Sequence, residues 1–599
     1  MRTVLIAVSM MSLMARCIDT YAQVKTDSVE KVSVTKKAFR SGIKLISTNP
    51  GDTIVGERSA AAYAQFAGRI VRNIYIDRIG FEKSIYDTAK RVEKTVSTIA
   101  NNLHVNTREK TIRQHLFFEK NRPLNPHRLA DNERFLRDRD FILDSRIVVV
   151  PVEGTDSVDV TVVTRDVFSL GATFGGSLPS APKVGLYDAN VDGRGQRIEF
   201  TALLDQDRTP HFGYSLLYRK SSIFGSLANV ELGYTQLNTG YSIGDEIEYA
   251  AYTRIDRPLV SPYSRWAGGV ELSRNWSKNV YAKEDSLFLD YKYNLFDSWI
   301  GYNIGINKPM ENRMRHFLAI RYFDGYYLDP AEQAEARQEI KYNSGYGVLS
   351  EISVFKQNFY KTRYVFGFGR TEDIPAGFSV GVTGGYLRLI DVERPYASLK
   401  FNYGQASRKG NFYRLLLQVG GFVRKSGLED VVVQAGATYF TRLLHMNRFK
   451  MRSLVSATYT QITNQVVLNW LDINKTEIPG FRTDSLEASK RLAVHLESVL
   501  FTPLSLLGFR MAPFAAVDVV PVHCLSCENP ADVFWGFSAG LRTRNENLIF
   551  GTLEVKLTFI PSDEYGESMF VFGFKQNLRV KNTGTFAQKP SLIAYNQRR

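Results

Sequence analysis

The stretch IPGFRTDSLEASKRLAVHLESVLFTP, residues 478 to 503, joins a polar turn to an alternating segment. Successive side chains of a strand point to opposite faces, so the segment from Arg491 onward has two distinct faces. One face carries Leu492, Val494, Leu496, Ser498 and Leu500, and the other carries Ala493, His495, Glu497, Val499 and Phe501. A half-buried strand of a water-soluble protein has the same pattern. The number of similar segments therefore decides the fold.

Similar segments fill the chain from Asp166 to about Lys581, and examples are IEFTALL, HFGYSLLY, LANVELGY, HFLAIRYF and FYRLLLQVGGF. We count about 20 such runs, separated by clusters of Asn, Asp, Gly, Pro and Lys. The 38 Phe, 31 Tyr and 44 Gly suit short strands, tight turns and aromatic girdles at a membrane surface. After Ala22, no run reaches the roughly 18 consecutive apolar residues of a spanning helix.

The first residues read as an export signal. Arg2 supplies a positive charge, Val4 to Ala15 form an apolar core, and Thr20-Tyr21-Ala22 form a cleavage site before Gln23. Cys17 does not predict a lipoprotein, because Arg16 precedes it where a small residue is required and cleavage would discard it. We therefore expect a signal peptide over residues 1–22, followed by a polar lead-in over residues 23–67.

Export combined with many strands of about ten residues predicts a membrane barrel. A water-soluble sheet protein of this size would need two packed layers or a fixed repeat, and no regular period is present. A closed barrel satisfies every backbone hydrogen-bonding group in lipid. The sequence therefore predicts a mainly β fold, a transmembrane antiparallel β-barrel over residues 166–582. If residues 583–599 and the N-terminal region both lie in the periplasm, the strand number must be even.

Residues 68–165 predict a separate α/β domain. Ile70, Ile74 and Ile76 indicate a strand, and charged helical sequence follows over residues 84–120. Asn125-Pro126 has the form of a helix start, with Leu129, Phe135 and Leu136 directed inward. Residues 147–152 and 158–163 then form a hairpin around the turn 153–156.

This order of strand, helix, helix, strand, strand resembles a polypeptide-transport-associated (POTRA) domain. The segment FLRDRDFILDSRIVVVPVEGTDSVDVTVVTRD fits the second half of that domain, whereas the stretch from Ser84 to Asn106 is longer than the family pattern. An unrelated small α/β domain is the alternative.

The start of the barrel region resembles the BamA/TamA-type outer-membrane proteins. VGLYDANVDGRGQRIEF, residues 184 to 200, followed by LLYRKSSIFGS, residues 216 to 226, matches their opening strands. The matching positions are Asp188, Asn190, Gly193 and Gly195. The resemblance implies a barrel of roughly 16 strands in the bacterial outer membrane.

The opening stretch then resembles the loop that these proteins insert into their barrel, with the motif aliphatic, Arg, Gly, aromatic. The corresponding positions are Ile478, Pro479, Gly480 and Phe481, so proline replaces the arginine. Arg482 is the nearest substitute, and the resemblance places Glu497 and Asp518 as its acidic partners on the two following strands. An ordinary Pro-Gly turn is the alternative interpretation.

We find no motif that predicts catalysis, and no cofactor or metal site is expected. The elbow Gly-x-Ser-x-Gly, the helix motif His-Glu-x-x-His and a Walker loop are missing from the sequence. Glu372-Asp373 lies in turn-like sequence and is interpreted as solvated loop charge. Cys524 and Cys527 provide only half of a zinc site; a disulfide, a redox pair and two incidental thiols are the other interpretations.

The resemblance implies a protein that inserts polypeptides into the outer membrane or translocates them across it. Its partners would be outer-membrane lipid, an unfolded or extended client polypeptide and accessory proteins of the periplasm or outer membrane. The net charge of +15 is spread along the chain, which argues against nucleic acid. A passive porin or receptor is the alternative, followed by an outer-membrane enzyme.

Overall fold

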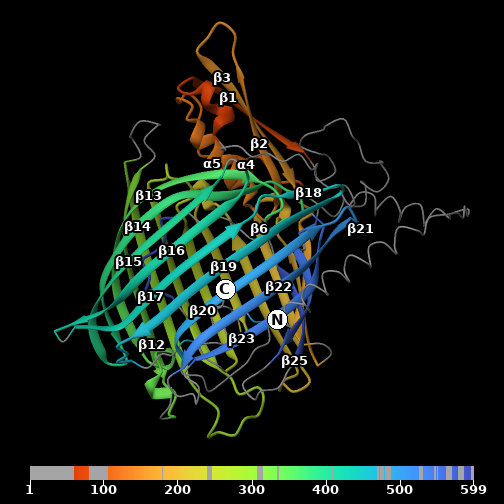
Figure 1. Ribbon diagram of the computed structural model, residues 1–599. Coiled ribbons are helices and arrows are strands. Elements are labelled where there is room, and N and C mark those ends of the chain that lie inside the picture. The colour runs from red at the N-terminus through yellow and green to blue at the C-terminus, as the bar shows by residue number, and fades with distance from the viewer. Residues whose placement is uncertain are drawn as a thin grey trace, which may run out of the picture.

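In the computed structural model, a small α/β domain stands on one rim of a large barrel (Figure 1). The structure describes residues 60–79, 105–177, 180–238, 246–305, 314–333, 336–407, 409–425, 427–467, 471, 478, 488–506, 508–524, 531–545, 548–549, 551–561, 569–577 and 586–594. The predicted signal peptide, most of the lead-in and part of the predicted helical stretch 84–120 lie outside these residues. Among the described residues, no helix has the length and apolarity to span a membrane.

The N-terminal domain has a three-stranded sheet in the order β1-β3-β2, with β1 parallel and β2 antiparallel to the central strand β3. The predicted hairpin is confirmed as β2 and β3. The elements in chain order are η2 (Ala61–Phe66), β1 (Ile70–Ile79), α4 (Glu109–Arg113), α5 (Pro126–Arg137), β2 (Ile142–Pro151) and β3 (Ser157–Asp166). A shift in the β1–β3 register between Val71 and Asn73 directs Val71 inward and leaves Ile70 exposed.

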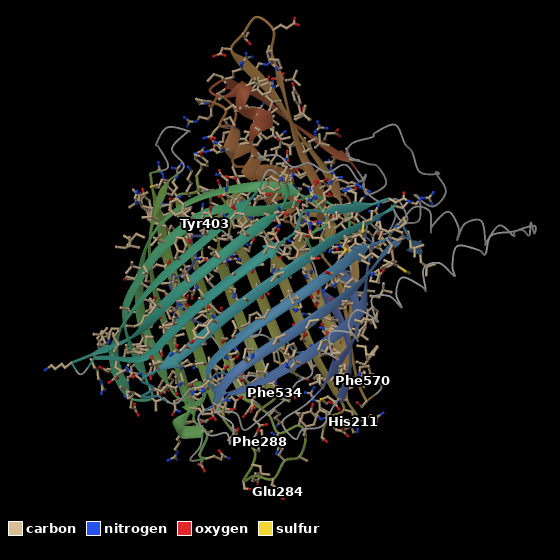
Figure 2. The ribbon with its side chains drawn as sticks, viewed as in Figure 1. His211, Glu284, Phe288, Tyr403, Phe534 and Phe570 are labelled. Carbon is tan, nitrogen blue, oxygen red and sulfur yellow. The ribbon has the colours of Figure 1, made fainter. Side chains whose placement is uncertain are left out.

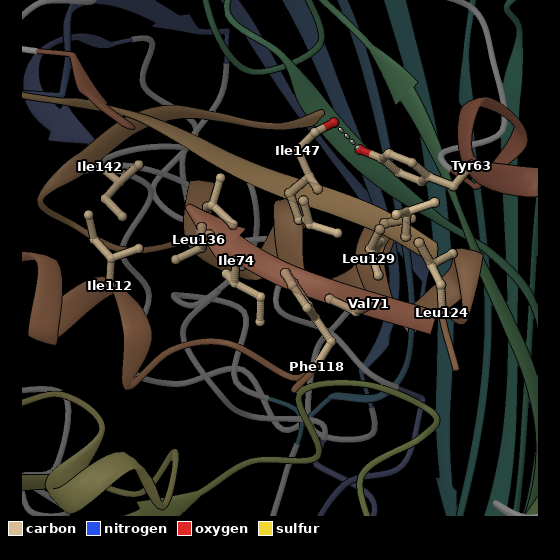
Figure 3. Close-up of a cluster of buried hydrophobic side chains, with 14 of the residues drawn as sticks. Tyr63, Val71, Ile74, Ile112, Phe118, Leu124, Leu129, Leu136, Ile142 and Ile147 are labelled. Carbon is tan, nitrogen blue, oxygen red and sulfur yellow. Dashed lines mark hydrogen bonds between the residues drawn. The ribbon is translucent and has the colours of Figure 1, made fainter. Parts of the chain in front are cut away.

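Helix α5 starts where its sequence predicts. The Asn125 side chain accepts hydrogen bonds from the backbone N–H groups of His127 and Arg128, at 3.0 and 3.3 Å, so it caps the helix. Leu129 and Leu136 pack into the domain core shown in Figure 3. In the same view the Tyr63 hydroxyl donates to the backbone oxygen of Ile147 at 3.2 Å, which ties η2 to β2.

The barrel contains twenty long strands among the described residues, which agrees with the count of alternating runs and exceeds the 16 that the resemblance implies. The strands are β4 (Leu170–Ser177), β5 (Ala181–Asp188), β6 (Gln196–Leu204), β7 (Phe212–Lys220), β8 (Asn229–Thr235), β9 (Glu248–Arg257), β10 (Trp266–Ser277), β11 (Lys292–Ile304), β12 (Arg315–Asp329), β13 (Gly345–Thr362), β14 (Glu372–Leu389), β15 (Val392–Ala406), β16 (Phe412–Arg424), β17 (Gly427–Phe440), β19 (Phe449–Thr463), β20 (Ala488–Phe501), β22 (Phe509–Cys524), β23 (Ala531–Arg544), β24 (Thr552–Ile560) and β25 (Met569–Asn577).

Short structures accompany the connections between these strands. The three-residue strand β18 (Leu444–Met446) and the two-residue strand β21 (Ser505–Leu506) only lengthen hairpins, since β17 pairs with β19 and β20 pairs with β22. The 3-10 turns are η3 (Val191–Gly193), η4 (Ile223–Gly225), η5 (Ala336–Gln338) and η6 (Ile340–Tyr342).

The barrel wall is apolar outside and polar inside. Along β13, Val348 and Ile352 are exposed on the outer face, whereas Glu351 and Ser353 are buried inside the barrel. The same alternation recurs on the other strands, so a belt of exposed aliphatic side chains surrounds the barrel. Figure 2 shows Tyr403 near the rim that carries the domain and Phe570 near the opposite rim. The alternation and the closed wall are those of a transmembrane β-barrel.

The barrel closes between its last and first strands, β25 and β4. Neighbouring strands elsewhere pair through long backbone ladders, such as the one from Gly345↔Leu389 to Thr362↔Glu372. At the β25–β4 seam, the Gln576 side chain accepts from the Phe174 N–H at 2.8 Å and donates to the Ala172 oxygen at 2.9 Å. A side-chain amide therefore contributes to closing this seam.

The C-terminal residues are not placed as predicted. Residues 586–594 lie in the barrel lumen, where Ala587 and Ile593 are buried among inward-facing side chains of the wall. The expectation of a periplasmic tail over residues 583–599 is wrong for this described part. Nothing in its sequence had indicated a docking site, because it has neither periodicity nor a motif.

Candidate functional site

Five charged or ionisable side chains meet on the lumen face of β20, β22, β23 and β24. Glu497 accepts two hydrogen bonds from Arg542, each at 2.6 Å, and Arg542 also donates to Glu554 at 2.7 Å. His495 Nδ1 lies 2.5 Å from Asp518 Oδ1, and the two residues are direct partners in the β20–β22 register. We call His495, Glu497, Asp518, Arg542 and Glu554 the charged wall cluster.

Strand alternation brings this cluster together. His495 and Glu497 are two residues apart on β20, so they share one face of the strand, the one directed into the lumen. Arg542 on β23 is the direct pairing partner of Glu554 on β24. The guanidinium of Arg542 also lies 4.2 Å from the centre of the Phe514 ring. Opposite charges offset one another where water is partly excluded, and loss of one partner leaves a charge without compensation.

The His495–Asp518 contact does not indicate a nucleophilic triad. In such a site the second ring nitrogen faces a serine or cysteine, but His495 Nε2 lies 3.8 Å from Glu497 Oε2. Ser498 is nearby in sequence, yet it points to the other face of β20, where its Oγ lies 2.8 Å from Ser453 Oγ. The cluster is therefore an ion-pair network.

The connection between β19 and β20 carries the predicted loop motif, of which the structure describes Ile478. Its side chain is 2% exposed and belongs to a buried cluster that includes Val520 and Phe534 of the barrel wall. A Cβ added to Gly536 would lie 3.0 Å from Ile478 Cγ2, so the glycine allows this close contact. Pro479 to Arg482 lie outside the described residues, so the inserted loop remains a prediction beyond Ile478.

The acidic partners of the predicted loop have other contacts in the described wall. Glu497 pairs with Arg542, and Asp518 contacts His495, so neither acid depends on Arg482 for compensation. The sequence reasoning missed Arg542, although an arginine at an inward position near an acid of an adjacent strand is a usable signal. That signal needs the strand register, which alternation alone does not supply. A contact of Arg482 with this cluster remains a prediction.

The barrel-start motif joins the barrel to the N-terminal domain. Asn190 donates from Nδ2 to Thr107 Oγ1 at 2.9 Å and accepts from the Gly195 N–H at 2.8 Å. Asp188 Oδ1 accepts from the Asn190 N–H at 2.9 Å, which fixes the turn. One buried amide thus bridges the β5–β6 connection and the domain.

Gly193 shows why this turn needs glycine. Its φ is +65°, and an added Cβ would lie 2.4 Å from the backbone oxygen of Asn106. Its own carbonyl accepts from the Arg108 N–H at 2.9 Å and from Thr111 Oγ1 at 3.0 Å. Side chains at this position would separate the domain from the barrel, so docking is the role that the structure gives to this motif.

Helix α5 covers the domain-side mouth of the barrel through charged contacts. Arg137 forms an ion pair with Asp373 at 2.8 Å, and Lys361 at the end of β13 pairs with Glu133. Ser261 in the β9–β10 connection donates to Asp131 at 2.6 Å. Contacts on both sides of α5 explain why nearly its whole surface is buried, although its sequence predicts only one inward face.

Glu372 and Asp373 are not the solvated loop charges that their sequence context indicates. Both are buried at the start of β14, and Asp373 pairs with Arg137. Glu372 accepts hydrogen bonds from the backbone N–H groups of Val365, Phe366 and Gly367 at 2.7, 2.8 and 2.7 Å. Turn-like sequence was a poor guide for Asp373 because its partner comes from the N-terminal domain, and for Glu372 because the N–H groups of the preceding turn point at its carboxylate.

Burial and charge shift the pKa values of two groups in the domain. Burial alone would raise the pKa of Glu133, but the charges of Arg137 and Lys361 lower it to about 2. Burial, assisted by Arg139, lowers the pKa of His115 to about 3. The Nδ1 of His115 lies 2.6 Å from the Thr111 oxygen, as expected for a neutral ring that donates there. Glu133 is therefore charged, and His115 neutral, at physiological pH.

Cys524 is the last residue of β22. It is buried and disulfide-bonded, so the interpretation as an incidental thiol is wrong. Cys527 lies outside the described residues.

Known proteins offer only weak matches. No family model and no curated protein matches the chain. Among solved structures, the chain is similar to CdiB from Escherichia coli (11% identity, 92% of this chain and 98% of that chain, TM-score 0.36) and to CdiB from Acinetobacter baumannii (12%, 92% and 99%, 0.35). It is also similar to BamA from Haemophilus ducreyi lacking POTRA domains 1–3 (11%, 92% and 94%, 0.29). The assignment of the fold rests on the strand pairing itself.

Proposed function

We propose that this protein inserts polypeptides into the bacterial outer membrane or translocates them across it. A membrane barrel whose mouth is covered by a mixed-sheet domain supports this function. In the proposal the domain captures an extended client by adding a client strand to an edge of its sheet, a mode that uses unpaired backbone groups.

The observation that carries the proposal is the difference between the two sheet edges. Along β2, the Ile147 N–H donates to Glu133 at 3.0 Å and the Ser145 oxygen accepts from Arg137 at 3.0 Å, so α5 covers this edge. Along β1, Val71 pairs with the segment 121–122, and the Ile74 oxygen accepts from Arg113 Nη2 of α4 at 3.2 Å. Tyr75 lies beyond the pairing with 121–122 and is exposed. Client strands would therefore add to β1.

Site-specific photocrosslinking tests this assignment in intact cells. A photoreactive residue in place of Tyr75, which is 52% exposed, should crosslink to exported polypeptides. The same residue in place of Arg146, exposed on the covered stretch of β2, is the matched control and should give little product. Equal crosslinking at both positions, or none at either, would contradict client capture on β1.

A passive porin or receptor is the alternative function. The described lumen holds Ile478 and residues 586–594, and α5 covers one mouth, which is an unfavourable arrangement for free diffusion. Deletion of the whole domain is a poor test of this alternative, since it would also remove the contacts of α5 with Asp373 and Lys361 at the barrel mouth. Crosslinking avoids that damage.

A further inference from the structure

The lumen holds residues 586–594 mainly through contacts to their backbone. The Phe586 N–H donates to Gln357 Oε1 at 3.2 Å, and the Ile593 N–H donates to the Tyr396 hydroxyl at 3.2 Å. The Ser591 oxygen accepts from Lys400 Nζ at 2.7 Å. Backbone groups are common to all polypeptides, so these contacts suit many sequences.

One further backbone contact and two side-chain contacts also hold the segment, one of them from Lys400 Nζ to Ser591 Oγ at 3.1 Å. Arg321 Nη1 donates to the Pro590 oxygen at 3.0 Å, and Lys589 Nζ forms an ion pair with Asp297 at 2.8 Å. Asp297 also pairs with Arg321 at 2.8 Å, so the carboxylate is held in place by the wall. This ion pair selects a positive charge at one position of the bound segment.

Apolar contacts lie on either side of the ion pair. Ala587 packs with Phe317 and Phe355, and Leu592 packs against Leu349 and neighbouring wall residues. We call the lumen face formed by Asp297, Arg321, Gln357, Tyr396 and Lys400 the lumen groove. It lies on β11, β12, β13 and β15, whereas the charged wall cluster lies on β20, β22, β23 and β24, a different part of the barrel wall.

We propose that the lumen groove is a binding site for extended polypeptide segments that carry a basic residue between small and aliphatic residues. Residues 586–594 occupy it in the same chain, and a client segment of like chemistry binds when they leave. The inference rests on the proposed function for the identity of the client, but not for the existence of the site.

Peptide binding to the purified protein tests the site directly. The chain ending at Asn582, folded in detergent, should bind the fluorescent peptide FAQKPSLIA with a saturable rise in anisotropy. The intact chain should bind it at least about ten times more weakly, because its own segment competes. The Gln588 side chain is exposed in the bound segment, so a peptide with alanine at this position should bind like the original.

The ion pair supplies the sharper comparison. Glutamine at the Lys589 position of the peptide should weaken binding to the shortened chain about fivefold. In a shortened chain with Asp297→Asn the two peptides should bind alike. Equal losses in both backgrounds, or no binding to a folded shortened chain, would overturn the proposal.

A second experiment covers the case in which the shortened chain does not fold. A protease site replacing residues 583–585 lets the intact chain fold first, and cleavage should then allow labelled peptide to exchange into the groove. A cleaved protein that never exchanges the segment would also overturn the site. Peptide binding without crosslinking at Tyr75 would support the groove and contradict the proposed function. Crosslinking at Tyr75 without peptide binding would support the proposed function and contradict the groove.

Discussion

Arg137 of α5 forms a forked ion pair with Asp373 at the start of β14, with Nε to Oδ2 at 3.0 Å and Nη2 to Oδ1 at 3.0 Å. The two side chains are 4% and 7% exposed. Two donors on two oxygens fix orientation as well as distance, so this pair aligns the domain with the barrel mouth.

Removal of either partner should loosen the domain. We expect Arg137→Met to cost about 3 to 5 kcal/mol, because Asp373 would remain buried without compensation. The double variant with Asp373→Asn should lose less than the sum of the single variants. Thermal unfolding in detergent measures both effects. Arg122→Met, in an exposed pair with Glu119, is the control and should change little.

Acid should weaken the domain in two overlapping ranges of pH. The folded-state pKa of His115, about 3, lies below its usual 6.5, so the unfolded chain takes up a proton first and stability falls as pH drops from 6.5 toward 3. The slope for one such group is about 1.4 kcal/mol per pH unit. The folded-state pKa of Glu133, about 2, lies below its usual 4.5, so its contribution is lost between pH 4.5 and 2.

Variants separate the two groups. His115→Phe should remove the loss between pH 6.5 and 4.5, whereas Glu133→Gln should keep that loss and remove part of the one below. Thermal unfolding of the domain across pH provides the measurement. His211→Phe, on the opposite rim (Figure 2), is the control. An unchanged profile in His115→Phe would show that the buried ring does not govern the first range.

The charged wall cluster should depend on Arg542. Arg542→Met should destabilise the barrel by about 3 to 5 kcal/mol and be strongly non-additive with Glu497→Gln. Arg388→Met, in an exposed pair with Asp391, should leave stability unchanged.

Arg482 can be tested in the same cycle. If it also contacts the cluster, Arg482→Ala should be more harmful than Arg491→Ala and non-additive with Glu497→Gln or Asp518→Asn. Additive double variants would show that Arg482 acts independently of both acids.

The seam should depend on one amide. Gln576→Ala leaves the Ala172 oxygen and the Phe174 N–H without this partner, which costs about 1 to 3 kcal/mol if the groups stay dry. The temperature at which the folded barrel loses its fast mobility on gels should therefore fall. Lys575→Ala changes the adjacent exposed side chain and should leave that temperature unaltered.

Epitope insertion tests the orientation of the barrel. Glu284 lies in the β10–β11 connection on the rim opposite the domain (Figure 2), so an epitope there should bind antibody on intact cells. An epitope at Gly410, in the domain-side β15–β16 connection, should bind only after permeabilisation. The opposite result would place the domain outside the cell.

Local sequence patterns predicted strands and helix starts well, but they predicted poorly which side chains pair across the fold. Alternation identified the barrel, and Asn125 identified the start of α5, because both depend on residues close in sequence. The burial of Asp373 could not be read in this way, since Arg137 lies in another domain. Glu497 was named as an acidic site residue, but its partner Arg542 depends on register, and the family pattern misled the strand count.

The strand β25 and the segment held in the lumen follow one another in the chain. Residues 578–585 are the only chain between the end of β25 and this segment. Because eight extended residues span at most about 30 Å, the segment stays within that reach of the seam after it leaves the groove. Return of the segment to the groove is therefore an intramolecular event, with the high effective concentration that a short tether gives.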